Sequence, residues 1–102
     1  MVLTDPKPAR RCADTLVCLV EPTRIRILDV LRTGPKNVTE LAKALKVEIV
    51  NVSHHLSVLR HAGLVETRKD GRFVVYALDP EFADGKGGLG IDLGWCKVKV
   101  VG

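Results

Sequence analysis

The stretch VTELAKALKVEIVNVSHHLSVLRHAG, residues 38–63, decides the fold because it holds two helical patterns with a very short break between them. Apolar residues recur at helical spacing on both sides of the break at residues 46–48, and Gly63 ends the second pattern. Asn37 precedes the first pattern and Glu40 follows three residues later, which is the arrangement of a capping box. Two helices joined by so short a turn predict a helix-turn-helix.

Two segments with alternating apolar residues, 64–69 and 72–78, come directly after this helix pair. Asp70-Gly71 lies between them and is a strong signal for a tight β-hairpin. A hairpin in this place is the wing of a winged helix-turn-helix. We therefore predict an α+β fold, mainly helical, with a β-hairpin wing and an added C-terminal strand.

The flanking residues complete the predicted organisation. Residues 1–10 include Pro6 and Pro8 and predict a flexible N-terminal arm, and residues 11–80 form the winged domain. Residues 81–102 predict a Gly-rich linker and one C-terminal strand, which we expect to form a dimer contact. We expect this strand and the first predicted helix, residues 11–20, to form the dimer interface together.

Two helices precede the helix-turn-helix. The first is predicted over residues 11–20, and the second begins at Pro22 and ends at Gly34-Pro35. Cys18 lies nearly opposite the apolar face of the first helix on a helical wheel. That face consists of Cys12, Ala13, Leu16, Leu19 and Val20.

Composition narrows the functional classes. The chain has 102 residues, which suits one small domain, and its net charge of +4 permits a polyanionic partner. Its apolar runs fall far short of the about 20 residues of a membrane span, and its start lacks the apolar core of a secretory signal, so we expect a cytoplasmic protein. The sequence holds no nucleophile elbow, P-loop or HExxH motif, so we expect no enzyme.

The second helix of the pair, residues 49–62, divides into two faces. Ile49, Val52, Leu56 and Leu59 cluster as its core side, while Leu41, Ala44 and Leu45 form the buried side of the helix before it. The opposite face is rich in Asn, Ser and His and carries few charges, which fits hydrogen bonding in a DNA major groove. The candidate DNA contacts on this helix are Val50, Asn51, Ser53, His54 and Ser57.

The wing adds basic candidates. Arg68, Lys69 and Arg72 flank its tip and can reach the DNA backbone or a minor groove, although an ordinary charged hairpin tip has the same composition. In residues 48–76 the basic residues are these three and Arg60, and the acidic residues are Glu48, Glu66 and Asp70, so this region carries little net positive charge. With so few basic residues in one chain, we expect DNA affinity to require the contacts of two chains in a dimer and to depend on salt concentration.

The three histidines point in different directions. His54 and His55 are adjacent, so their side chains diverge by about 100° and do not converge on one metal ion. We expect His54 to face DNA, or else solvent, and His55 to pack against the protein. His61 lies near the helix end, where simple exposure is the alternative to a phosphate contact.

The cysteines leave one chemical alternative open. Cys12, Cys18 and Cys96 are an odd number without a CxxC pair, which indicates free thiols. Cys18 is the candidate reactive thiol, whereas Cys12 and Cys96 fit apolar surroundings. A thiolate site made from Cys12 or Cys18 with Cys96 would select soft metal ions or oxidants.

Four segments together resemble ArsR/SmtB-type winged-helix regulators: EPTRIRILDVL, VTELAKALKV, VSHHLSVLRHAGLV and RKDGRFVVYAL. The resemblance covers residues 16–78 and implies a homodimeric, operator-binding repressor, often released by a metal ion or another inducer. It also supports Val50, Asn51, Ser53 and His54 as DNA contacts.

The sequence departs from that family in three places. Asn37 and Thr39 stand where many metal-sensing members carry a cysteine pair, and the C-terminal residues match neither the usual last helix nor its metal ligands. Lys46 stands where the family often has glycine. If that turn needs a left-handed residue, lysine costs roughly 1–2 kcal/mol there.

We therefore expect double-stranded DNA and a second copy of the chain as partners, with an inverted-repeat operator and no confident cofactor. The alternative is a winged-helix module that binds protein or RNA without sensing, since a fold alone does not fix a function.

Overall fold

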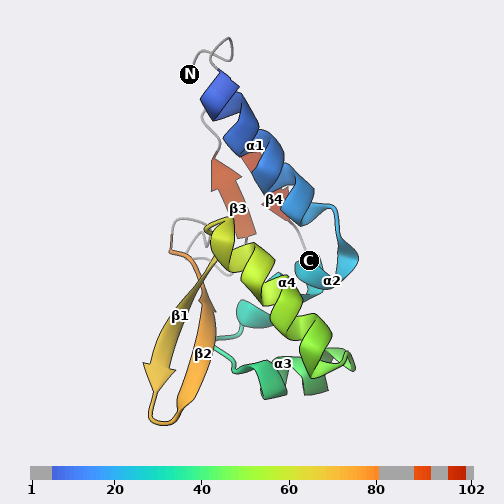
Figure 1. Ribbon diagram of the computed structural model, residues 1–102, viewed down its shortest axis with the longest axis vertical. Helices are drawn as coiled ribbons and strands as arrows, with labels where there is room; N and C mark the ends of the chain where they lie inside the picture. Colours follow the sequence, from blue (N-terminus) through green and yellow to red (C-terminus); the bar gives the residue numbers. More distant parts are fainter. Residues whose placement is uncertain (1–5, 81–88, 93–96, 101–102) are drawn as a thin grey trace.

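The computed structural model describes residues 6–80, 89–92 and 97–100. It confirms the winged helix-turn-helix, with helices packed together and a wing that projects from them (Figure 1). The elements are α1 (Pro6–Leu19), α2 (Pro22–Leu31), α3 (Val38–Leu45), α4 (Ile49–His61), β1 (Val65–Asp70), β2 (Phe73–Leu78), β3 (Leu89–Asp92) and β4 (Lys97–Val100).

The starts of α2 and α3 follow from side-chain caps. The carboxylate of Glu21 accepts a hydrogen bond of 2.9 Å from the backbone N–H of Arg24, and Pro22 occupies the first turn of α2 as predicted. At α3 the predicted capping box is present. Asn37 Oδ1 accepts from the Glu40 N–H at 2.8 Å, and Glu40 Oε1 accepts from the Asn37 N–H at 3.0 Å.

The turn between α3 and α4 requires a left-handed residue. Lys46 supplies it with φ 56 and ψ 45, which confirms that a lysine occupies a position suited to glycine. Arg26 Nη2 donates a hydrogen bond of 2.9 Å to the carbonyl oxygen of Leu45, at the end of α3. The guanidinium of α2 therefore satisfies one of the terminal carbonyl groups of α3.

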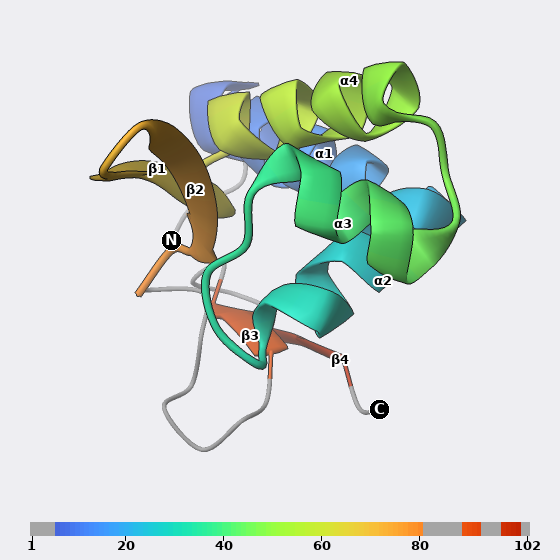
Figure 2. The ribbon, with the colours of Figure 1, turned by 90° about the horizontal axis from the view of Figure 1, so that it is seen from below.

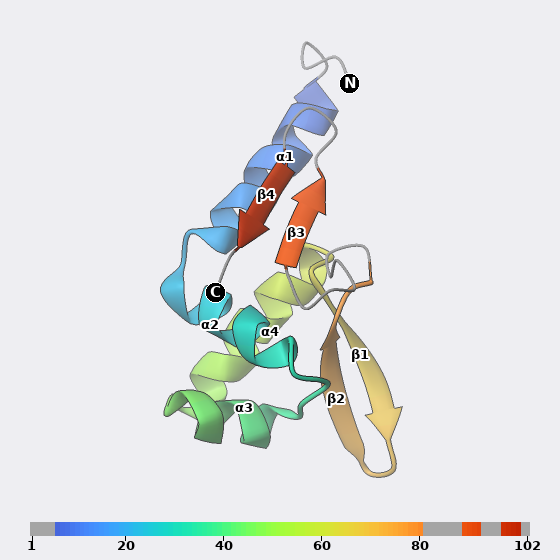
Figure 3. The ribbon, with the colours of Figure 1, turned by 180° about the vertical axis from the view of Figure 1, so that it is seen from behind.

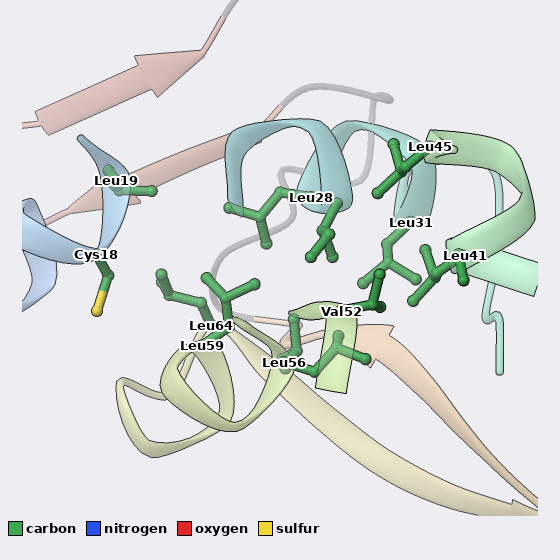
Figure 4. Close-up of a cluster of buried hydrophobic side chains, with 13 residues drawn as sticks. Cys18, Leu19, Leu28, Leu31, Leu41, Leu45, Val52, Leu56, Leu59 and Leu64 are labelled. Atoms are coloured by element: carbon green, nitrogen blue, oxygen red, sulfur yellow. The ribbon is translucent and has the colours of Figure 1, made fainter. Parts of the chain in front are cut away.

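The core lies where α2, α3 and α4 meet and is closed by the base of the wing. Leu28, Val52, Leu56 and Leu59 have no exposed surface. In Figure 4, Leu41 and Leu45 lie at the α3 end of this cluster and Cys18 and Leu19 at the α1 end. Burying such side chains stabilises the fold by roughly 1.5–3 kcal/mol each.

Two predicted core positions are wrong. Ala42, not Ala44, is buried on α3 together with Leu41 and Leu45, because α3 turns that edge towards its neighbours. Ile49 was expected on the core face of α4, yet it is 50% exposed. It is the first residue of α4, and the fully buried residues of this helix begin only at Val52.

The wing pairs in antiparallel register from Val65↔Leu78 to Asp70↔Phe73. The two turn residues are therefore Gly71 and Arg72, one position later than the predicted Asp70-Gly71. Gly71 has φ 61 and Arg72 does not have a positive φ, which is the pattern of a type II′ hairpin turn with glycine first. Lys36 and Tyr76 exchange backbone hydrogen bonds of 3.0 and 2.8 Å, so the loop before α3 fixes the wing to the domain.

The first helix differs from its prediction at its start. It begins at Pro6, not Arg11, because the N–H groups of a first turn have no partner within the helix and proline is tolerated there. Part of the predicted flexible arm is thus helical.

The buried face of α1 also differs from the prediction. Thr15, Cys18 and Leu19 are buried, whereas Ala13 and Val20 are exposed. The three buried residues follow i, i+3, i+4 spacing near the C-terminal end of α1, which packs on the core.

Two short strands replace the single C-terminal strand of the prediction. β3 and β4 pair antiparallel from Leu89↔Val100 to Asp92↔Lys97. Apolar residues alternate with other residues within each short segment, Leu89 and Ile91 in one and Val98 and Val100 in the other, so each segment has its own strand pattern. The β3–β4 hairpin lies at the same end of the molecule as α1 and on the face opposite α4 (Figures 2 and 3).

Candidate nucleic-acid interface

The solvent-facing side of α4 contains every residue that the sequence predicted to contact DNA from this helix. Each of these five side chains is exposed, and Val50 has 76% of its surface free. They lie opposite the fully buried Val52, Leu56 and Leu59 of the same helix. The five exposed residues are Val50, Asn51, Ser53, His54 and Ser57.

This side of the helix carries two rows of side chains, since residues four apart are neighbours on a helix. One row runs from Val50 to His54. The other runs from Ile49 through Ser53 to Ser57, and its first member was missed because its sequence spacing places it with Val52 and Leu56. Its position in the first helical turn is the signal that could have identified it.

The start of α4 is open. Glu48 occupies the N-cap position, but its side chain makes no capping hydrogen bond. The backbone N–H groups of a first helical turn carry the positive end of the helix dipole, which favours phosphate oxygens. An anionic backbone can therefore approach this end of the helix, although the exposed carboxylate of Glu48 opposes it.

His55 is a structural residue, as predicted, and joins α4 to the corner between α1 and α2. Its Nδ1 lies 3.3 Å from Arg24 Nη1 and 3.7 Å from Glu21 Oε2. A guanidinium can only donate, so Nδ1 of His55 accepts from Arg24 when the imidazole is neutral with its proton on Nε2, and a protonated ring instead faces the Glu21 carboxylate. Arg24 Nε also donates to the carbonyl oxygen of Cys18 at 2.9 Å, which ties the end of α1 to the same cluster.

The pKa of Glu21 is lowered from its ordinary value of 4.5. Partial burial by itself would raise it, but the N–H of Arg24, a protonated His55 and the Arg24 guanidinium together outweigh that effect. Glu21 is therefore a carboxylate that caps α2 and faces two cationic groups.

His61 turns back on its own helix. Its Nδ1–H donates a hydrogen bond of 2.7 Å to the carbonyl oxygen of Ser57. Near the C-terminus of a helix such a donor satisfies a carbonyl group and interacts well with the helix dipole. His61 remains exposed and makes this one contact within its own helix, so its predicted phosphate contact stays a prediction.

The three basic residues of the wing are exposed but do not share one face. Successive residues in a strand point to opposite sides, so Arg68 and Lys69 diverge. Arg68 donates to Glu66 Oε1 from Nε at 2.9 Å and from Nη2 at 2.7 Å, which offsets its charge. Lys69 and Arg72 have no such partner among the described ion pairs, so they are the stronger candidates for phosphate contacts.

A second exposed surface lies on α1. Val17 is 60% exposed and Val20 is 76% exposed, and Ala13 is exposed on the same helix. Exposed apolar side chains that gather on one element are typical of a protein–protein contact. Figure 1 shows α1 at one end of the long axis of the molecule, with the wing tip towards the other end.

The described residues do not fit the family's metal site on α3. Asn37 uses its side-chain oxygen to cap α3, and Thr39, the second residue of that helix, is exposed. Within the part of the chain that the structure describes, no three His, Cys, Asp or Glu residues lie close enough to hold a metal ion.

The prediction that Cys18 faces away from the apolar side of its helix is wrong. Its side chain is only 8% exposed and belongs to the core, because α1 turns this side to the domain. A buried thiol behaves as a small apolar side chain and is less open to metals or oxidants. The side chain of Cys12 and all of Cys96 lie outside the described residues, so the predicted thiolate site stays a hypothesis.

The fold and the exposed α4 face define a winged helix-turn-helix of the kind that reads nucleic acid. Comparison with protein families agrees, since residues 21–67 match the model described as bacterial regulatory protein, arsR family. The chain belongs to the ArsR family, which confirms the predicted resemblance.

Three relatives illustrate the similarity. The HTH-type transcriptional regulator NmtR of Mycobacterium tuberculosis is 47% identical over 74 residues, which cover 72% of this chain and 62% of NmtR. HlyU from Vibrio cholerae is 32% identical, with a TM-score of 0.66 over 74% of this chain and 82% of HlyU. The homodimeric winged helix-turn-helix DNA-binding domain of Mb0332 from Mycobacterium bovis is 30% identical, with a TM-score of 0.68 over 72% and 68%.

The chain spans 62% and 66% of the lengths of two curated relatives, NmtR and the transcriptional repressor SdpR of Bacillus subtilis. Among the described residues, α-helices are too short and too polar to pass through a lipid bilayer.

Proposed function

We propose that this protein is a transcriptional regulator that binds duplex DNA as a homodimer and represses transcription from an inverted-repeat operator. The observation that carries the proposal is the exposed, mostly polar side of α4, which faces away from the fully buried side of the same helix. This division gives the helix a rigid support and a free reading face. A major groove is about 12 Å wide and admits one such helix.

Residues at the start of α4 reach the base edges in this arrangement. Asn51, Ser53 and His54 offer hydrogen-bond donors and acceptors, and Val50 offers an apolar contact. Ser57, one turn further, is placed for the sugar–phosphate backbone. Lys69 and Arg72 extend the contact from the wing, where positive charge positions the protein without reading sequence.

The second copy of the chain binds at the end of the molecule that carries α1, away from the wing tip. We propose that the exposed side of α1 packs against its counterpart in a partner, with the β3–β4 hairpin near the contact. Figure 3 shows β3 and β4 beside α1 in the half of the molecule away from the wing tip, which supports this arrangement. For both α4 helices to enter successive major grooves, this contact has to hold them roughly 34–36 Å apart. A regulator of this kind works on the chromosome, so we place it in the bacterial cytoplasm.

Release by a soft metal ion or a thiol-reactive compound remains a hypothesis. Burial of Cys18 means that an inducer acting there must first open the contact between α1 and the core. Such a reaction would couple the sensing thiol to the interface helix.

Binding-site selection from random duplex DNA at several salt concentrations tests the proposed function. We expect an enriched inverted repeat and an affinity that falls steeply with salt, because phosphate contacts release counterions. A flat salt response with no enriched sequence would instead favour the module that binds protein or RNA, and would overturn the proposal.

A further inference from the structure

The large apolar side chains that the described surface exposes come as three neighbouring pairs. Val17 and Val20 lie on α1, Ile49 and Val50 begin α4, and the last pair lies on the wing. The pair on α4 stands apart because it adjoins polar side chains on both rows of the reading face. The wing pair is Phe73 and Val74.

Ile49 is only half covered by its own chain. Half of its surface is free, whereas Val52, three residues later, is fully buried. Ser53 follows one turn after Ile49 in the same row, so Ile49 heads a line of side chains that continues along the reading face. A free β-branched apolar residue there exposes hydrocarbon to water unless a partner covers it.

We propose that Ile49 is a specificity-determining residue, which together with Val50 receives the 5-methyl groups of thymines in the operator half-site. This inference rests on the proposed function and names the base that the start of α4 selects. The thymine methyl is the apolar group that base pairs present in the major groove, and aliphatic side chains match it. Neither side chain can hydrogen-bond to a phosphate or to another base edge.

The order of side chains gives the half-site a direction. Apolar contact comes first, at Ile49 and Val50, and hydrogen bonding follows one turn later at Ser53 and His54. Since N-terminal residues of a recognition helix meet base edges, thymine falls opposite the helix start and a base with hydrogen-bonding edges follows.

Replacement of thymine by deoxyuracil in the selected operator tests this inference. The exchange removes only the methyl group and keeps every hydrogen-bonding atom. We expect one or two positions per half-site at which the exchange weakens binding about fourfold, the value for one buried methyl-sized group. Ile49→Ala should weaken binding to the thymine duplex by a similar factor and should remove most of the difference between thymine and uracil at one of those positions.

Ser57→Ala is the matched control, because Ser57 lies in the same row two turns further on. Its effect should be equal on the thymine and uracil duplexes. If Ile49→Ala weakens binding to both duplexes equally, or to neither, Ile49 does not receive a methyl group and the inference is wrong.

Two further readouts separate this inference from others. A changed sedimentation coefficient for Ile49→Ala would assign the residue to a contact between copies and would overturn the inference. If selection yields no bound duplex at all, the proposed function itself fails. Thermal unfolding checks that the variant is folded, which its half-exposed position favours.

Discussion

Lys46 holds the turn between α3 and α4 in a conformation that suits glycine. A non-glycine residue in the left-handed region costs roughly 1–2 kcal/mol, and glycine loses about 0.5–1 kcal/mol through its greater freedom in the unfolded chain. We expect Lys46→Gly to raise the free energy of unfolding by about 0.5–1 kcal/mol, measured from urea denaturation midpoints. Lys46→Ala keeps the Cβ atom and should give no such gain, and an equal gain in both variants would contradict the explanation.

Glu21 makes the stability of the fold depend on pH. Its pKa is lower in the folded protein than its ordinary value of 4.5, so its ionised form stabilises the fold. This contribution is complete above the unfolded pKa and is lost as the pH falls through the folded pKa. We expect Glu21→Gln to destabilise the protein near neutral pH and to have almost no effect once the wild-type carboxyl is protonated.

Denaturation of wild type and Glu21→Gln between pH 7 and pH 3 measures this difference. His55→Gln removes one charged partner and should reduce the difference between pH 7 and pH 3. A loss that stays constant across the whole range would show that Glu21 acts only through packing.

Single residues differed in how well the sequence predicted them. The capping box of Asn37 and Glu40 and the left-handed Lys46 depend on local geometry, which the sequence contains. Ile49 and Cys18 were misplaced because their exposure depends on where the neighbouring elements end. A helical wheel gives the direction of a side chain but not whether anything lies opposite it.

Lys69 and Arg72 are the two basic residues of the wing that we expect to contact phosphate. Lys69→Ala and Arg72→Ala should each weaken binding to all duplexes by a similar factor and lower the salt slope by about 1, as expected for phosphate contacts. Titrations at three or more salt concentrations measure both effects. Neither change should alter which sequence is preferred.

Arg68 provides the matched control on the same hairpin. It is paired with Glu66, so removing both side chains, Glu66→Ala with Arg68→Ala, takes away no net charge. We expect the double variant to retain its affinity and salt slope. A loss as large as that of Lys69→Ala would mean that Arg68 leaves Glu66 to contact DNA.

The element boundaries show why α1 was harder to predict than α4. The core side of α4 is covered along most of its length, so its apolar period corresponds to burial. The buried residues of α1 lie near one end, whereas Ala13 and Val17 are exposed and Leu16 is half-buried. Sequence periodicity assumes a neighbour along the whole helix, which α1 does not have within the described residues.

The proposed dimer forms through the exposed side of α1. The pair Val17→Asp with Val20→Asp places two carboxylates on the exposed side of α1, where they would lose hydration in a dimer. We expect this variant to sediment as a monomer at micromolar concentration, while the wild type is a dimer. Its affinity for a two-half-site operator should fall strongly, whereas far-UV circular dichroism should stay unchanged.

A variant that still sediments as a dimer would place the interface elsewhere. The sequence predicted the fold and the reading face of the molecule because both follow from patterns within the chain. The details of the interface do not, since half of its contacts belong to another copy.

The double variant Ser53→Ala with His54→Ala tests the central claim, that the exposed face of α4 reads DNA sequence. The measurement is the ratio of affinities for the selected operator and for a scrambled duplex of equal length. We predict that this ratio falls tenfold or more, since each good base contact contributes roughly 1–3 kcal/mol of discrimination, while binding to the scrambled duplex is retained. An unchanged ratio in a folded, dimeric variant would contradict the account.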